Sequence, residues 1–479
     1  MEAVEGGGRP AAAAGNFTET DGQFSELCVM LCGQILSFLH FLTFPAVMTR
    51  FSLSRAYFGA FLAVLGFAAL TPAFAAGFLV RENSAEAVAT SYAGNGSRAS
   101  GPDTVFSNPA GMTRLQADGF ELGASIILPS STFSGAARQA TPTGPVPLAG
   151  NTGGDSGRTA LIPNLYGVVR VMPDVSIGIA ITAPFGNSSE YDPGWVGRYL
   201  GTKTMATSAD INPAIAWRIN DTWSVGAGFS AQYLKLDVTQ AIDQAAIFGA
   251  PVPDATFRFK AHDWSYGFNA GLLADFGDTR VGLTYRSNIN HRIEGTLDFT
   301  GASPLLGLAS GAANAKARLP STTTLSITSD VAPNITLSAD VQYSHWSLFK
   351  DVTILSANPP FPNVQGYRDA WMVAVGGIYR VSPRLALKAG IAFDQTPVTS
   401  RYRAVTLPDT DRYLLGMGAE VRLTDSMTVE GAYGHSFAFN NPNMNTSINN
   451  TDPITHSVTL NGRYDINVDI VALTFRYAI

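Results

Sequence analysis

The sequence has little charge, little cysteine and few long apolar runs. Only 14% of its 479 residues are charged, against about 25% in ordinary soluble domains. The hydrophobic content of 46% excludes an intrinsically disordered chain. A helical membrane protein with several spans needs repeated apolar runs of about 20 residues, and the sequence beyond residue 76 contains none. The net charge of -6 argues against a protein that binds nucleic acid.

Cysteine is confined to the first part of the chain. Both cysteines, Cys28 and Cys32, precede residue 76. The rest of the chain therefore has no disulfide framework and no cysteine-based metal or redox site.

The beginning of the chain has the pattern of an export signal. After Met48 come Arg50 and Arg55, an apolar stretch over 56–70, and a small-residue cleavage pattern that ends at Ala75. This pattern predicts a secretory signal peptide over 48–75. A membrane anchor is the alternative, but the apolar stretch is too short to span a bilayer. We interpret residues 1–47 as a translation start placed too early, the alternative being a genuine extension with a lipid-facing helix.

From about residue 118 onward, apolar and polar residues alternate with the period of a β-strand. The final segment is the clearest, with an apolar series that ends at Phe475, Tyr477 and Ile479 and alternates with Thr474 and Arg476. Six short turns separate the segments, and seven longer connections lie near 129–160, 186–203, 241–260, 301–316, 350–366, 395–410 and 441–456. Thirteen connections predict fourteen strands. An even number of strands with alternating short and long connections is typical of an all-β, antiparallel transmembrane barrel of the outer membrane, whereas an open soluble sheet requires no such alternation.

A barrel of fourteen strands encloses more space than its own side chains fill. Residues 76–117 precede the first strand, show no clean alternation, and are rich in Gly, Ser and Asn. We therefore expect residues 76–117 to form a hatch that plugs the lumen of a barrel over 118–479.

Several short motifs resemble the long-chain fatty acid transporter (FadL) family of outer-membrane proteins. They include Ala76-Gly77-Phe78, Tyr92-Ala93-Gly94, the hatch motif Asn108-Pro109-Ala110, Leu283-Thr284-Tyr285-Arg286-Ser287 and Pro397-Val398. The resemblance extends in order over 76–479. It implies a fourteen-stranded barrel with an N-terminal hatch in the outer membrane of a Gram-negative bacterium. It also implies a monomeric, non-enzymatic transporter without cofactor or metal, surrounded by outer-membrane lipid and lipopolysaccharide, which takes up long-chain fatty acids or, alternatively, aromatic hydrocarbons.

The resemblance assigns roles to particular residues. Capture is expected in a groove between the third and fourth extracellular loops, which here carry Ile247, Phe248, Leu305, Leu306 and Leu308. The alternative is that these apolar residues only pack on one another. The hatch start, Phe78, Leu79 and Val80, is expected to contribute to an interior site, or else to seal the barrel.

A fatty acid carboxylate needs a cation nearby, since an Arg side chain binds a carboxylate through two hydrogen bonds. Alternation places three basic candidates on the lumen side, Arg286, Arg292 and Lys388. The alternative is that each pairs with a lumen acid such as Asp340 or Glu420.

In this family, exit is tied to a kink in the third strand, and Ala183-Pro184-Phe185-Gly186 matches that position. Pro donates no hydrogen bond to a sheet and Gly weakens one, so a gap in the wall is physically reasonable there. The alternative is that these four residues merely end the strand.

Two other classes of function remain as alternatives. A general porin would keep a wide polar channel and lack an apolar hatch. A lipid hydrolase embedded in the barrel is disfavoured because the sequence has no Gly-x-Ser-x-Gly motif, and because Ser344 and His345, as neighbours on a strand, face opposite sides.

Overall fold

The computed structural model describes residues 77–139, 144–447 and 458–479. The expectations for 1–47 and for the signal peptide over 48–75 lie outside the described residues. Within the described part of the chain, no helix is both long and apolar enough to cross a bilayer.

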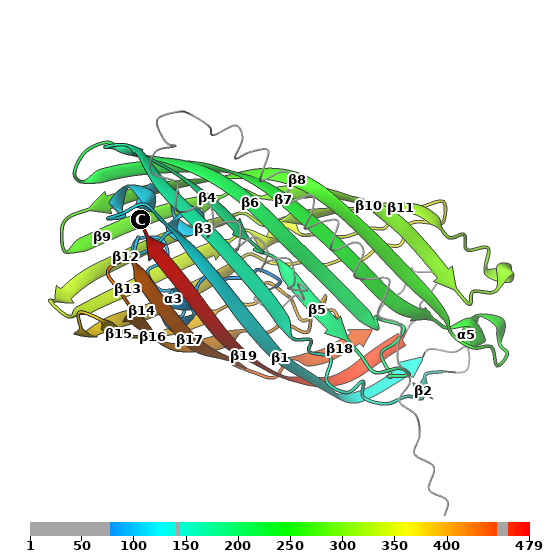
Figure 1. The fold of residues 1–479 in the computed structure, drawn as a ribbon. Helices are drawn as coiled ribbons and strands as arrows, with labels where there is room; N and C mark the ends of the chain where they lie inside the picture. The colour runs from blue at the N-terminus through cyan, green and yellow to red at the C-terminus, as the bar shows by residue number, and fades with distance from the viewer. Residues whose placement is uncertain (1–76, 140–143, 448–457) are drawn as a thin grey trace, which may run out of the picture. The chain divides into compact units, whose positions relative to one another are not determined.

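Nineteen strands in the described residues form one sheet (Figure 1). Most of these strands form fourteen successive segments around the barrel wall, which we call staves. Eleven staves are single strands, and the other three consist of two strands separated by a short interruption. The staves are β1 (Gly119–Gln139), β3 (Ala160–Met172), β4 (Val175–Thr182) with β5 (Gly186–Glu190), β6 (Lys203–Arg218), β7 (Trp223–Ile242), β8 (Ala255–Asp275), β9 (Thr279–Arg286) with β10 (Ile289–Thr300), β11 (Gly311–Leu319) with β12 (Thr322–Ala332), β13 (Ile335–Ser344), β14 (Ala370–Ser382), β15 (Leu385–Asp394), β16 (Arg412–Arg422), β17 (Met427–Ala438) and β19 (Val458–Ala478). The short strands β2 (Val146–Leu148) and β18 (Asn443–Ser447) lie in connections.

The first and last strands close the barrel. β1 pairs antiparallel with β19 over its full length, from Gly119 opposite Ala478 to Gln139 opposite Val458. Closure matters because every backbone N–H and C=O at membrane depth needs a partner. The predicted fourteen-stranded antiparallel barrel is confirmed.

Outward and inward faces follow the predicted alternation. Val471 and Leu473 on β19 are 45% and 60% exposed, whereas the alternating residues Ile470 and Ala472 are buried. The six short turns also lie where the sequence predicts them. The predicted bounds of the long connections are less accurate. The first and third connections are shorter than predicted, because β1 runs on to Gln139 and β8 already begins at Ala255, whereas the connection after β13 is longer and covers 345–369.

Short interruptions in two neighbouring staves, between β9 and β10 and between β11 and β12, lie at the same height of the wall. They invert which residues of the alternating pattern face inward. Arg286 pairs with Thr322, and Ile289 pairs with Leu319, so residues 287–288 and 320–321 stand between the two ladders. Arg286 and Ile289 both face inward although they are three positions apart, which regular alternation forbids. The prediction that Arg292 faces the lumen is therefore wrong: Arg292 is exposed on the outer face, between the buried residues His291 and Ile293.

The segment before β1 lies inside the barrel. It contains α3 (Ala85–Ala89), α4 (Thr104–Ser107) and the 3-10 helix η1 (Pro109–Arg114), and residues of α3 are almost completely buried. Three more short helices lie in connections: α5 (Gln244–Phe248), η2 (Pro304–Leu306) and η3 (Trp346–Leu348).

Glycines on the inner wall let this segment approach the strands closely. A Cβ added to Gly390 on β15 would lie 2.1 Å from the Thr90 carbonyl oxygen, and one added to Gly416 on β16 would lie 2.1 Å from the Val88 oxygen. On the opposite side of the barrel, a Cβ on Gly282 would lie 1.9 Å from the Gly96 oxygen. Only glycine leaves room for backbone at these distances, so the wall is shaped around the hatch.

Candidate functional site

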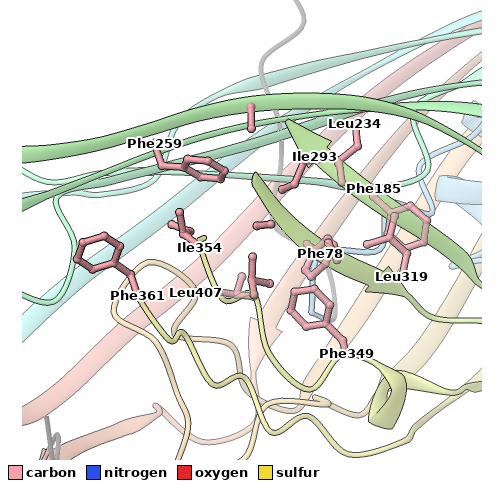
Figure 2. Packing of buried hydrophobic residues seen from close by; sticks show 14 of the residues in the cluster. Phe78, Phe185, Leu234, Phe259, Ile293, Leu319, Phe349, Ile354, Phe361 and Leu407 are labelled. Atoms are coloured by element: carbon pink, nitrogen blue, oxygen red, sulfur yellow. The ribbon is translucent and has the colours of Figure 1, made fainter. Parts of the chain in front are cut away.

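The long-connection end of the barrel holds a large apolar cluster, which we call the loop-end cluster. The inner faces of β8, β10 and β11 contribute buried residues such as Phe259, Ile293 and Leu319. The connection after β13 contributes Phe349, Ile354 and Phe361, and that after β15 contributes Leu407. Figure 2 shows these side chains converging from the sheet on one side and the connections on the other. The inverted alternation beyond 287–288 and 320–321 produces this surface, because it turns the apolar positions of β10 and β11 inward.

The structure brings the third and fourth extracellular connections together. The Gln244 side chain donates to the Gly301 oxygen (3.0 Å) and accepts from the Ser303 N–H (2.7 Å). Of the predicted capture residues, Ile247, Leu306 and Leu308 pack partly buried against the loop-end cluster. Phe248 is half-buried, and Leu305 is 84% exposed. Packing thus accounts for three of these five residues, and Leu305 offers an apolar side chain to the outside.

The hatch start is embedded in aromatic side chains. The Phe78 ring lies 4.9 Å from that of Trp346, 5.1 Å from that of Phe349 and 5.9 Å from that of Phe185, measured between centroids. The backbone N–H of Gly77 donates to the Asp409 carboxylate at 2.9 Å. Burial raises the pKa of Asp409. A hydrogen bond to a loop carboxylate and ring packing thus both hold the hatch start.

The third stave is interrupted where the sequence predicts a kink. β4 ends at Thr182 and β5 begins at Gly186, and the pairing with β6 slips by one residue between them, from Thr182 opposite Asp210 to Gly186 opposite Thr207. On the other side, the last pair between β3 and β4 joins Leu165 and Ile181.

Residues of the hatch start replace β3 as the partner of this interruption. The Val80 N–H donates to the Pro184 oxygen and the Gly186 N–H donates to the Phe78 oxygen, each at 2.9 Å. Leu79 and Phe185 face each other between these two bonds as an antiparallel pair. Hatch and wall therefore share a short two-stranded ladder at the level of the interruption.

A cavity adjoins this ladder inside the barrel. The cavity has a volume of about 100 Å³. Its apolar lining includes Leu79, Phe106, Phe185, Ile289 and Met372, and its charged lining consists of Arg81, Arg286 and Asp340. The cavity thus combines an apolar wall with charged groups.

Arg286 lines the cavity and is held by neutral partners. Its guanidinium donates to Ser230 Oγ and to the Phe106 oxygen, each at 2.9 Å, and lies 3.8 Å from the centre of the Phe106 ring. Among the residues that the structure describes, no carboxylate forms an ion pair with Arg286. Its partners are neutral, so its charge is not cancelled by direct contact.

Lys388, the other lumen cation predicted from sequence, is fully engaged. Its ammonium lies 2.7 Å from Glu420, 2.8 Å from Glu430 and 3.4 Å from Glu86 of the hatch. The predicted pairing with Glu420 is confirmed. Asp340, the other predicted partner, instead accepts from the Gly94 N–H of the hatch at 2.6 Å.

Glu86 is the centre of a buried charge network that fixes the hatch. Arg98 Nε lies 2.6 Å from its carboxylate, and Arg476 on β19 lies 3.5 Å away. Burial alone raises the pKa of Glu86, but the charges of Arg98, Lys388 and Arg476 outweigh it and lower that pKa. The carboxylates of Glu86, Glu420 and Glu430 come within 4.8 Å of one another, with the Lys388 ammonium in contact with all three.

The hatch motif Asn108-Pro109-Ala110 has a structural role. The Asn108 amide donates to the Gly96 oxygen (2.6 Å) and to the Leu272 oxygen on β8 (3.2 Å), and its oxygen accepts from the Ala110 N–H (3.1 Å). The motif therefore caps η1 and ties the hatch to the wall. The body of the hatch is fixed at many points, in contrast to its start.

Sequence reasoning missed three residues that hold the hatch start, namely Trp346, Phe349 and Asp409. Asp409 lies in the predicted connection over 395–410, and Trp346 and Phe349 precede the predicted connection over 350–366. No periodic pattern marks a loop residue that folds back into a lumen.

Comparison with known proteins agrees with this geometry. The model of the family described as "Outer membrane protein transport protein (OMPP1/FadL/TodX)" matches residues 66–479. A curated relative from Escherichia coli O6:H1 (strain CFT073), named "Long-chain fatty acid transport protein", is 29% identical over 400 residues, which cover 76% of this chain and 88% of the relative.

Two solved structures show the same fold. The FadL homologue of Pseudomonas aeruginosa superposes with a TM-score of 0.78 at 25% identity, covering 84% of this chain and all of that one. The toluene transporter TodX of P. putida superposes with a TM-score of 0.62 at 15% identity, covering 83% and 99%. With a family match over the whole barrel and hatch, the chain belongs to the outer-membrane transport family that includes FadL and TodX.

Proposed function

We propose that the protein takes up hydrophobic molecules passively across the outer membrane, with long-chain fatty acids as its substrates. The proposed route begins at the exposed Leu305, passes through the loop-end cluster to the cavity at the hatch start, and leaves through the wall at Ala183–Gly186. The name of the E. coli relative supports fatty acids as the substrate. No chemical step is part of this proposal, so the protein acts as a transporter and not as an enzyme.

The ladder between the hatch start and the interrupted stave is the observation that carries the proposal. It consists of two backbone hydrogen bonds, each worth about 0.5–1.5 kcal/mol net. A ligand bound with micromolar affinity releases about 8 kcal/mol. Binding energy of this size exceeds the cost of breaking the two hydrogen bonds and offsets part of the cost of exposing the buried side chains of residues 78–80. Departure of these residues would leave Pro184–Gly186 without a partner on the side of β3.

A disulfide across this ladder tests lateral exit. Leu79 and Phe185 form the non-hydrogen-bonded pair of the ladder, for which the Cα atoms lie about 4.5 Å apart, and a disulfide accepts this separation. We expect the double variant Leu79→Cys/Phe185→Cys to lose oleate uptake under oxidising conditions and to regain it after reduction. The single variants serve as controls for the loss of each side chain. Uptake by the oxidised double variant at the rate of the reduced one would exclude movement of the hatch start.

Arg286 distinguishes fatty acids from aromatic hydrocarbons. We expect Arg286→Gln to weaken oleate binding at least tenfold, because a charge-assisted hydrogen bond is lost, and to leave toluene binding unchanged. Binding is measured by calorimetry in mild detergent. Equal losses for both ligands would contradict a carboxylate site at Arg286.

Two further expectations complete the proposal. Cleavage after Ala75 would give a mature chain that begins at the hatch, which N-terminal sequencing of the outer-membrane protein tests. A general porin, the rival transporter, would show sustained open-pore current in a planar bilayer, whereas a barrel filled by the hatch should not.

A further inference from the structure

The outer face of β10 and β11 carries charge immediately beyond the apolar band of the barrel. Between the interruptions and the short turns, outward positions are apolar and exposed, such as Tyr285 on β9 and Leu325 on β12. Between the interruptions and the long connections, the inverted alternation places polar residues on the outer face. Arg292 on β10 and Lys316 and Arg318 on β11 are all exposed there. Long connections mark this end of the barrel as the extracellular one, so the three cations lie at the depth of the outer leaflet headgroups.

These three cations face one another across the ladder. Arg292 is directly opposite Lys316, and Arg318 is opposite Asn290 one step nearer to the interruption. Directly opposed side chains start about 5 Å apart, and like charges in such a pair repel. In the described chain, the side chains of the three cations make no hydrogen bond and no ion pair. The arrangement costs stability unless an anion from outside the protein lies between them.

Neighbouring strands extend the positive surface. Strands β7, β8, β10 and β11 lie side by side in the wall (Figure 1). On β8, Lys260 and His262 are exposed on the same outer face, and Lys235 of β7 is opposite His262. Asp237 is opposite Lys260 and already accepts two hydrogen bonds from Arg258, from Nε at 3.0 Å and from Nη2 at 2.8 Å.

Only two acids interrupt the outward positions of β10 and β11. Glu294 is opposite His262 of β8 and Asn314 of β11, and Asp298 lies farther toward the connection. A local excess of positive charge on a chain with net charge -6 is therefore a specific feature of this sector.

We propose that Arg292, Lys316 and Arg318 bind the phosphate groups of the phosphorylated glycolipid of the outer leaflet, lipopolysaccharide. Two arginines and a lysine provide the forked and the point-like donors that phosphates accept. Exposed Tyr285 and Leu325 lie below them at acyl-chain depth, so one lipid molecule meets apolar side chains with its chains and cations with its phosphates. The occupant is a lipid of the surrounding membrane and is distinct from the transported molecule.

The test uses lipid A with two phosphates and the same lipid with both phosphates removed, added to the delipidated full-length protein in mild detergent. Native mass spectrometry measures the bound fraction. We expect the intact protein to bind the phosphorylated form at least tenfold more tightly than the dephosphorylated one. The triple variant Arg292→Gln/Lys316→Gln/Arg318→Gln should lose this difference.

A matched control removes three exposed arginines elsewhere, Arg384→Gln/Arg422→Gln/Arg463→Gln, and should bind like the original protein. Heat-modifiable migration in gels confirms that both triple variants fold as barrels. Unchanged binding by the first triple variant would overturn the proposal, as would equal binding of the two lipid forms by the original protein. Equally tight binding of phosphatidylglycerol would assign the face to anionic lipids in general and overturn its assignment to the glycolipid.

Discussion

Close contact between the hatch and the glycines of the inner wall leads to a quantitative prediction for Gly390. A Cβ at this position would lie 2.1 Å from the Thr90 oxygen and 2.2 Å from its carbonyl carbon. Ordinary contacts begin at 3.4 Å, so the hatch backbone must retreat by about 1.3 Å, the difference between 3.4 and 2.1 Å. Thr90 directly follows α3, whose Glu86 belongs to the buried charge network, so the hatch has little freedom to retreat.

The expected cost of Gly390→Ala is that of overpacking a well-packed core, about 1–3 kcal/mol. Without the hatch, Gly390→Ala would instead stabilise the protein, because replacing Gly by Ala within a strand raises the free energy of unfolding by roughly 0.5–1 kcal/mol. Gly431 on β17 is the matched control, since a Cβ there meets no atom within 4 Å. We expect Gly431→Ala to raise the free energy of unfolding by roughly 0.5–1 kcal/mol, because a strand Ala there loses less backbone entropy and meets no clash.

Urea unfolding in lipid vesicles, followed by tryptophan fluorescence, measures both variants. Planar-bilayer recordings supply the second readout, because a displaced hatch should let small ions leak through Gly390→Ala but not through Gly431→Ala. Equal unfolding midpoints and equally silent bilayers for the two variants would refute the inference that the hatch body is seated on the wall glycines.

Three further predictions concern contacts that hold the hatch and the capture surface. Lys388→Met should destabilise the barrel by about 3–5 kcal/mol, because two buried carboxylates and the partly exposed Glu420 lose their shared cation; an unchanged urea midpoint contradicts this. Asp409→Ala should raise hydrogen exchange at Gly77 at least tenfold, since it removes the acceptor of that N–H, and unchanged exchange would show that this contact does not hold residue 77. Leu305→Gln should raise the oleate concentration for half-maximal uptake severalfold and leave stability unchanged, because the side chain is 84% exposed; unaltered uptake kinetics argue against capture at this loop.

Alternation along the strands carried most of the fold prediction. The outward series on β19 and the positions of the six turns follow from the period of two and from local turn residues, both of which are properties of adjacent positions. Arg292 marks the limit of this reasoning. Alternation counted from Arg286 puts it inside, and the interruption at 287–288 puts it outside.

Site residues were predictable where a local signal exists and not elsewhere. Pro184 marks the interruption because proline lacks an N–H, and the apolar start of the hatch marks Phe78. Nothing local indicates that Asp409, more than three hundred positions away, accepts from Gly77. The predicted roles of Phe78, Leu305 and Pro184 in transport stay predictions.

By itself, the sequence determined the barrel: charge scarcity, alternation and turn spacing fix the number of staves and, within an uninterrupted strand, the face that each residue presents, because these depend on neighbours along one strand. The tertiary structure alone decided what fills the barrel. Which cation stays free of carboxylates, which glycines seat the hatch and which segment pairs with the broken stave all depend on contacts across the lumen between residues distant in sequence. Charge is scarce because the outer band of the barrel is apolar. Inside the barrel, charged side chains such as Lys388 and Glu86 pair with one another where they hold the hatch, whereas Arg286 lines the cavity with neutral partners.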